Sequence, residues 1–185
     1  MKEQPILIGD IGATTSRWAL VDRGESARQS SHGFNPRTHA PQLLDTALLS
    51  LGDWVRQAKT VHYYGTGVLT GADRAFIRTA FHAINPGISV HAASDLLGAA
   101  RSFGREPAIV CILGTGSNSC LFDGRQITDQ IPTLGYPHGD AGSGWRIGAE
   151  LVRRFYQRRM PRSLATEFGQ LVPREHATFL DDLRN

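Results

Sequence analysis

The chain has 185 residues, of which 41% are hydrophobic and 20% charged, and its formal net charge is +3. That balance is typical of a soluble globular protein, and a small positive surplus spread along the chain does not predict a nucleic-acid partner. No segment has the apolar length needed to cross a bilayer, and the N-terminus lacks the features of a signal peptide. Cys111 and Cys120 lie in apolar runs without a CxxC pair, so we expect buried, reduced thiols and a cytoplasmic protein.

The first part of the chain alternates between strand-like and helix-like hydrophobic patterns. Strands are predicted over residues 5–10, 16–22, 27–33, 61–64 and 88–93. Helices are predicted over residues 41–55, 70–84 and 96–103. The expected order is therefore three strands and a helix, followed twice by a strand and a helix.

The pattern restarts after a plausible linker at residues 104–107. The next predicted elements are a strand over 108–113, a hairpin of strands 119–123 and 126–131, and a helix over 144–159. A strand followed by a glycine-containing loop thus occurs twice, near Asp10 and near Gly114. We therefore expect two lobes that face each other across a cleft, with domain bounds of 1–104 and 105–185.

The first of these loops follows Asp10 and contains Gly12, Thr14 and Thr15. Small residues in such a hairpin let backbone N–H groups approach phosphate oxygens, and the threonine hydroxyls can donate to them. A carboxylate at the strand end can hold Mg²⁺, usually through water. An ordinary hairpin with an aspartate at its turn is the alternative interpretation.

Two further glycine-rich loops follow in the second half. Gly114-Thr115-Gly116-Ser117-Asn118 comes after an apolar strand but has neither the lysine of a Walker A loop nor the third glycine of a Rossmann fingerprint. Residues 135–144 place Asp140 and Ser143 among four glycines directly before a helix, where backbone N–H groups could face an anion or a hydroxyl. A plain glycine turn and a helix cap by Asp140 or Ser143 are the alternatives.

In order and spacing, these loops resemble those of N-acetylglucosamine kinases and related BadF-type ATPases in the actin/hexokinase/Hsp70 superfamily. The resemblance extends over essentially the whole chain. It implies an α/β fold of two ribonuclease-H-like lobes, the first complete and the second truncated. The implied reaction is Mg²⁺-dependent transfer of the ATP γ-phosphoryl group to a sugar hydroxyl, most naturally on an amino sugar such as N-acetylglucosamine. Sugar and ATP are then the expected partners, and a homodimer is compatible with the family.

The resemblance also assigns roles to residues. Asp95 matches the catalytic base, although a helix cap would explain it too. Asp10 matches the metal-binding carboxylate. Matches to phosphate-binding positions are Gly12, Thr14, Thr15, Gly114, Thr115 and Gly116. Matches to sugar-binding positions are Asn35, Thr66, Asp95, Thr115, Gly116, Asn118 and Asp140.

The chain also departs from the family pattern. Ala141 stands where a glutamate is usual, and family members continue beyond this length. We therefore expect this chain alone to bind ATP weakly, to lack useful kinase activity, and to leave an apolar face of the second lobe uncovered. A non-catalytic sugar-binding or ATPase-like module remains an alternative. An iron–sulfur activator is disfavoured by the expected burial of both cysteines, and a repressor by the absence of a DNA-binding segment before the first strand.

Overall fold

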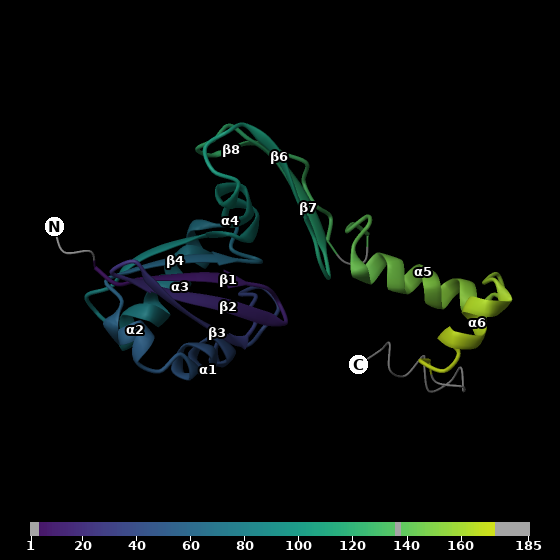
Figure 1. Ribbon diagram of the computed structural model, residues 1–185, viewed down its shortest axis with the longest axis horizontal. Coiled ribbons are helices and arrows are strands. Elements are labelled where there is room, and N and C mark those ends of the chain that lie inside the picture. The colour runs from purple at the N-terminus through teal and green to yellow at the C-terminus, as the bar shows by residue number, and fades with distance from the viewer. Residues whose placement is uncertain (1–3, 136–137, 173–185) are drawn as a thin grey trace. The chain divides into compact units, whose positions relative to one another are not determined.

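A five-stranded mixed sheet forms the centre of the first part of the computed structural model, which describes residues 4–135 and 138–172 (Figure 1). The strand order is β3-β2-β1-β4-β5. The strands are β1 Ile6–Ile11, β2 Thr15–Asp22, β3 Glu25–His32, β4 Thr60–Gly65 and β5 Ser89–Ser94. The first three are antiparallel, whereas β4 and β5 run parallel to β1. Ile11 pairs with Gly65, which pairs with Ser94, so the carboxyl ends of three parallel strands are level.

The helices of this part are α1 Gln42–Ser50, α2 Asp53–Gln57, α3 Gly71–Ile84 and α4 Asp95–Ser102. The single helix predicted over 41–55 is wrong: the chain breaks at Gly52, whose φ of +58° lies in the left-handed region that interrupts an α-helix. The start predicted for α3 is confirmed, because Thr70 and Asp73 form a capping box in which each side chain accepts the other's backbone N–H.

The main hydrophobic core lies between one face of the sheet and the helices α1, α2 and α3. Its centre is an edge-to-face cluster of Trp18, Tyr63 and Phe81, with ring centroids 6.0–6.3 Å apart. Helix α4 packs on the opposite face, where Gly98 lies so close to Tyr64 that a Cβ there would stand 2.6 Å from the tyrosine Cβ. Alternation along β1 and β4 thus places their fully buried residues on the face that packs against α1, α2 and α3, and leaves the strand ends for loops.

The second part of the chain contains a three-stranded sheet and two helices. The elements are β6 Ala108–Leu113, β7 Ser117–Phe122, β8 Ile127–Gln130, α5 Gly144–Tyr156 and α6 Arg162–Phe168. The strand order is β6-β7-β8, and the predicted β7–β8 hairpin is confirmed. Helix α5 ends before Arg158, which has a φ of +55°. Helix α6 then packs against α5 through Phe168 and Phe155, whose ring centroids are 5.4 Å apart. No pattern in the sequence had predicted α6.

The chain divides into two compact units, Met1–Cys111 with Ser119–Ile131 and Ile112–Asn118 with Pro132–Asn185. The division passes through β6 and β7, and the domain bounds of 1–104 and 105–185 stay a prediction. Within the described residues, no helix combines the length and the apolar character that a membrane span requires.

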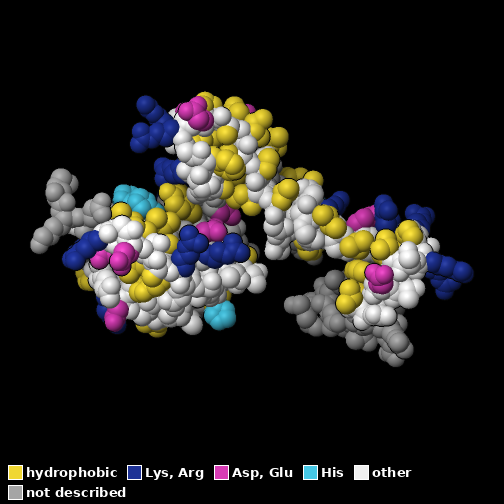
Figure 2. Space-filling view, in the orientation of Figure 1, with side chains coloured by type: hydrophobic (Ala, Val, Ile, Leu, Met, Phe, Trp, Pro, Cys, Tyr) yellow, Lys and Arg dark blue, Asp and Glu magenta, His cyan; other side chains and the backbone are white. Residues whose placement is uncertain are grey.

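Cys120 is buried as expected, but the expected burial of Cys111 is wrong. Cys111 shares one face of β6 with Ile109 and Leu113, which are 77% and 71% exposed, so this face of the strand is uncovered in the described part of the chain. Figure 2 shows hydrophobic side chains at the surface in the region of this sheet. An exposed apolar strand face of this kind favours association with another surface.

Candidate functional site

The level carboxyl ends of β1, β4 and β5 bring three candidate residues to one edge of the first unit's sheet. Asp10 lies at the end of β1, Thr66 follows β4, and Asp95 follows β5. The Thr66 backbone N–H donates to the Ile11 carbonyl at 2.9 Å, which ties the loop after β4 to the end of β1. Polar side chains at the carboxyl edge of parallel strands are where α/β proteins place their ligands.

Asp95 is not the cap of helix α4. The cap is Ser94, whose Oγ accepts the Leu97 N–H at 3.3 Å. Asp95 is the first helical residue, and its Oδ1 accepts the Leu96 N–H at 2.8 Å. The alternative that Asp95 is present only to cap the helix therefore loses its main support.

The surroundings of Asp95 raise the pKa of its carboxyl group. Burial is the largest cause, and the charge of Asp10 acts in the same direction. Hydrogen bonds from the Leu96 backbone and the Thr66 side chain oppose the shift without cancelling it. A carboxylate whose pKa is raised is a stronger proton acceptor, which is the property that a general base needs.

The loop between β1 and β2 is held by backbone hydrogen bonds. The Gly12 N–H donates to Thr15 O at 3.1 Å, and Gly33 N–H donates to Thr14 O at 2.9 Å. A Cβ at Gly33 would collide with the Gly12 carbonyl, so only glycine permits this approach. Because the Gly12 amide is engaged within the hairpin, the exposed side chains of Thr14 and Thr15 are the more accessible donors of this loop.

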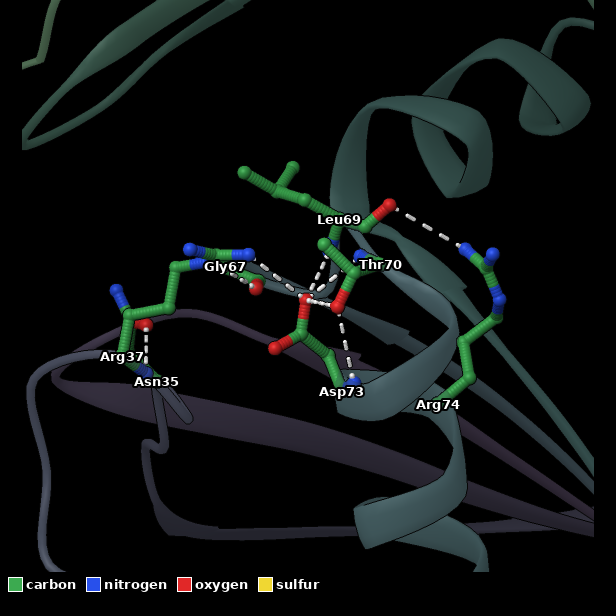
Figure 3. Close-up of polar contacts among 7 residues, drawn as sticks. All are labelled: Asn35, Arg37, Gly67, Leu69, Thr70, Asp73 and Arg74. Atoms are coloured by element: carbon green, nitrogen blue, oxygen red, sulfur yellow. Dashed lines mark hydrogen bonds and ion pairs between the residues drawn. The ribbon is translucent and has the colours of Figure 1, made fainter.

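Asn35 lies beside the loop that carries Thr66, although 31 positions separate them in the sequence. Its Oδ1 accepts the Arg37 N–H at 2.9 Å, and a Cβ at Gly67 would overlap this same oxygen. Figure 3 shows Asn35, Arg37, Gly67 and Asp73 as one connected group. The structure thus joins two candidate sugar-binding segments through Arg37 and Asp73, neither of which the sequence analysis had singled out.

In the second unit, the two glycine-rich loops are bound to each other. Ser117 donates its N–H to Asp140 Oδ1 and its hydroxyl to Ala141 O, each at 2.9 Å. The Gly144 N–H donates to Gly114 O at 2.8 Å. A Cβ at Gly116 would stand 3.0 Å from Asp140 Oδ1, so the Asp140 carboxylate would have to shift to admit a larger residue there. Candidate residues of both loops are therefore parts of one structure.

The cap of α5 is Ser143, which is fully buried and accepts the Arg146 N–H at 3.1 Å through its Oγ. Asp140 therefore has a different role: its carboxylate accepts the Ser117 N–H and so holds the Gly114–Asn118 loop, while its own backbone adopts a φ of +61°. A strained non-glycine residue of this kind is characteristic of functional loops. Asn118 lies in β7 and has interactions of its own, and Tyr136 and Pro137 of the second loop lie outside the described residues.

No protein-family model matches the chain, and neither does any curated protein. Among solved structures, a candidate N-acetylglucosamine kinase from Porphyromonas gingivalis is 39% identical, with a TM-score of 0.81 over 89% of this chain. A second candidate N-acetylglucosamine kinase, from Chromobacterium violaceum, is 22% identical, with a TM-score of 0.66 over 96% of this chain. The chain spans 61% and 67% of these two proteins, respectively.

The ROK hexokinase from Thermus thermophilus shares the fold at 15% identity, with a TM-score of 0.51 over 74% of this chain and 51% of its own. The predicted α/β, actin-like ATPase fold is therefore confirmed. Because the similarity to the Porphyromonas gingivalis protein covers 89% of this chain at 39% identity, the chain resembles proteins assigned as N-acetylglucosamine kinases and shares its fold, more distantly, with a ROK hexokinase.

Proposed function

We propose that the chain is part of an ATP-dependent sugar kinase that phosphorylates a hydroxyl of an amino sugar such as N-acetylglucosamine. The observation that carries this proposal is the placement of Asp10, Thr66 and Asp95 at the level ends of three parallel strands. The 39% identity to a candidate N-acetylglucosamine kinase supports the sugar class.

In this proposal Asp95 accepts the proton of the attacking sugar hydroxyl. Its raised pKa makes it a competent acceptor, and the Leu96 N–H, which donates to Asp95 Oδ1 at 2.8 Å, holds the carboxylate in one orientation. Asn35 and Thr66 contact the sugar from the first unit. In the second unit Thr115, Gly116, Asn118 and Asp140 take the corresponding role, since a carboxylate can accept hydrogen bonds from more than one hydroxyl.

The residues at these loops fit Mg-ATP. Asp10 is exposed and close enough to Asp95 for its charge to raise the pKa of that carboxyl, so the edge offers the oxygen donors that Mg²⁺ prefers. No group of three or more metal-binding side chains occurs within the described residues, and Mg²⁺ in kinases uses only one or two carboxylates besides phosphate and water. Asp10 would hold the ion, and Gly12, Thr14, Thr15, Gly114, Thr115 and Gly116 would face the phosphates. When bound, ATP would supply the phosphoryl group and Mg²⁺ would neutralise the negative charge of its phosphates.

The direct test is the thermal stability of the chain with a series of sugars, each with and without Mg-ATP. A ligand that binds the native state stabilises it by about 1.4 kcal/mol when its concentration is ten times Kd. We expect N-acetylglucosamine to raise Tm, glucose to raise it less, and Asn35→Ala to weaken the response. Equal responses to all sugars, or none, would remove the amino-sugar assignment.

Asp95→Asn separates binding from chemistry. In a complete enzyme that carries this chain together with the rest of the second lobe, loss of the proton acceptor is expected to lower phosphoryl transfer by about 10²-fold or more, the usual contribution of a positioned base. Sugar binding should change little, because asparagine keeps an oxygen for the Leu96 N–H. Transfer at the wild-type rate in Asp95→Asn would exclude Asp95 as the base.

A further inference from the structure

Arg37 connects two loops that are far apart in sequence. Its Nε donates to the Gly67 carbonyl at 3.2 Å, and its Nη2 donates to Asp73 Oδ2 at 3.0 Å (Figure 3). Its backbone N–H donates to Asn35 Oδ1. One residue therefore contacts the Asn35 segment, the loop after β4 and the start of α3.

The anchor of this connection is Asp73. Its Oδ2 also accepts the N–H groups of Leu69 and Thr70, at 3.0 and 2.6 Å, and the Thr70 hydroxyl at 2.8 Å. The side chain of Asp73 is only 14% exposed, whereas that of Arg37 is 44% exposed. The start of helix α3 thus holds the Asp73 carboxylate in place, and this carboxylate in turn holds the more exposed Arg37 side chain.

Gly67 closes the contact from the other side. Its φ of +75° is a conformation in which a side chain is strained, and a Cβ there would overlap Asn35 Oδ1 and approach Pro36 Cδ to 3.2 Å. The loop after β4 and the Asn35 amide therefore touch with no space between them. The position of Thr66, next to Gly67, depends on the same contact.

The Asn35 amide is oriented by this arrangement. Because its oxygen accepts the Arg37 N–H, the NH₂ group is the part left to donate to a ligand, and a sugar hydroxyl or an N-acetyl carbonyl oxygen can accept that bond. Within the described residues no hydrogen bond from this NH₂ group is formed.

We propose that Arg37 is a positioning residue for the sugar site: through Gly67 and Asp73 it sets the relative placement of Asn35 and Thr66, and so sets sugar affinity. This inference rests on the proposed function, because it assumes that these two residues contact the sugar. Only a planar guanidinium can donate to Gly67 O and Asp73 at once, whereas a lysine ammonium can keep the ion pair but not both bonds in this geometry.

The test compares Arg37→Ala, Arg37→Lys and a charge-matched control, Arg78→Ala, which removes an exposed cation from the same helix as Asp73. Calorimetric titration with N-acetylglucosamine measures Kd, hydrogen exchange measures the protection of the Asn35–Arg37 and Gly67–Thr70 amides, and Tm measures stability. Arg37→Ala is expected to raise Kd about tenfold and to speed exchange at both loops, because a hydrogen bond to a charged group is lost at each end. Arg78→Ala should change neither.

Arg37→Lys distinguishes positioning from a simple ion pair. We expect it to restore most of the Tm lost in Arg37→Ala, since the charge facing Asp73 returns, while Kd stays raised and the Gly67–Thr70 amides stay fast. Full recovery of Kd in Arg37→Lys, or an unchanged Kd in Arg37→Ala with normal exchange at both loops, would overturn the inference.

The failure of the proposed function gives a different result. If the wild-type chain does not bind N-acetylglucosamine at any concentration, the amino-sugar assignment is wrong, and so is the proposed effect of Arg37 on sugar affinity. The exchange data then show whether Arg37 fixes the two loops. If the wild type binds and the Arg37 variants bind equally well, the proposed function stands and the positioning role is wrong.

Discussion

Asp140 combines an unfavourable backbone conformation with a hydrogen bond that joins two loops. Its φ is +61°, and its Oδ1 accepts the Ser117 N–H at 2.9 Å. Three substitutions separate these two contributions. Asp140→Asn keeps an oxygen acceptor and tolerates the left-handed region, Asp140→Gly relieves the backbone but removes the acceptor, and Asp140→Ala removes the acceptor while keeping a Cβ.

The expected loss of stability in each variant follows from the hydrogen bond and the backbone conformation. A hydrogen bond to a carboxylate stabilises by about 1.5–3 kcal/mol, and a left-handed residue with a Cβ costs about 1 kcal/mol relative to glycine. Asp140→Ala should therefore destabilise the joined loops by about 2–3 kcal/mol, and Asp140→Gly by about 1 kcal/mol, since relief of strain offsets part of the loss. Asp140→Asn should also cost about 1 kcal/mol, because only the charge is lost.

Native-state hydrogen exchange at the Gly144 amide measures this local stability, because that amide donates to Gly114 O across the same two loops through backbone atoms that every variant keeps. Amides of β4, which belongs to the other compact unit, serve as the internal control. The predicted order of protection is wild type, then asparagine and glycine, then alanine. Less protection in Asp140→Gly than in Asp140→Ala would refute the argument from backbone conformation, and equal protection in all four proteins would refute the hydrogen bond.

Three further predictions follow from single residues. Because burial and Asp10 raise the pKa of Asp95 in the folded chain, the folded state retains this proton to higher pH than the unfolded state, and stability falls as pH rises through that range. Asp95→Asn should therefore raise the free energy of unfolding at about pH 7 but not at about pH 3, which urea titrations at the two pH values would show. A larger gain in stability at the lower pH would contradict the direction of the pKa shift. Tyr63 is fully buried, and its hydroxyl has no hydrogen-bond partner in the described part of the chain. Tyr63→Phe should therefore leave the fold intact and raise the free energy of unfolding by about 1 kcal/mol in a chemical denaturation. A loss of that size would instead show that the hydroxyl has a partner. Asn35→Ala should weaken N-acetylglucosamine binding by about 1–3 kcal/mol in calorimetry, since a desolvated hydroxyl loses its partner, and an unchanged affinity would displace the sugar site from this loop.

Local patterns predicted most of the first unit. Apolar runs bounded by turn residues located its strands and singled out Asp10 at the end of the first strand, whereas the family resemblance singled out Asp95. The split at Gly52 was missed because glycine is tolerated within a helical pattern, and only the observed φ of +58° shows the break. The exposure of Cys111 was missed because a pattern shows that a strand is apolar but not whether another element covers it.

The long-range parts of the site could not be read from the sequence. The bond of Arg37 to Asp73 spans 36 positions, and that of Ser117 to Asp140 spans 23. No periodicity reports a contact at such separation. A signal was present for one partner, since the Thr70–Asp73 spacing is that of a capping box, but a cap does not disclose that the same carboxylate receives an arginine from another loop.

The most direct test of the account is a titration of isotope-labelled chain with N-acetylglucosamine, followed by amide NMR. The account predicts that the perturbed amides are those of Asn35, Thr66 and Asp95 in the first unit and of Thr115 to Asn118 and Asp140 in the second, all with the same Kd. Perturbations confined to other parts of the chain, or none at saturating sugar, would contradict the claim that these loops form an amino-sugar site.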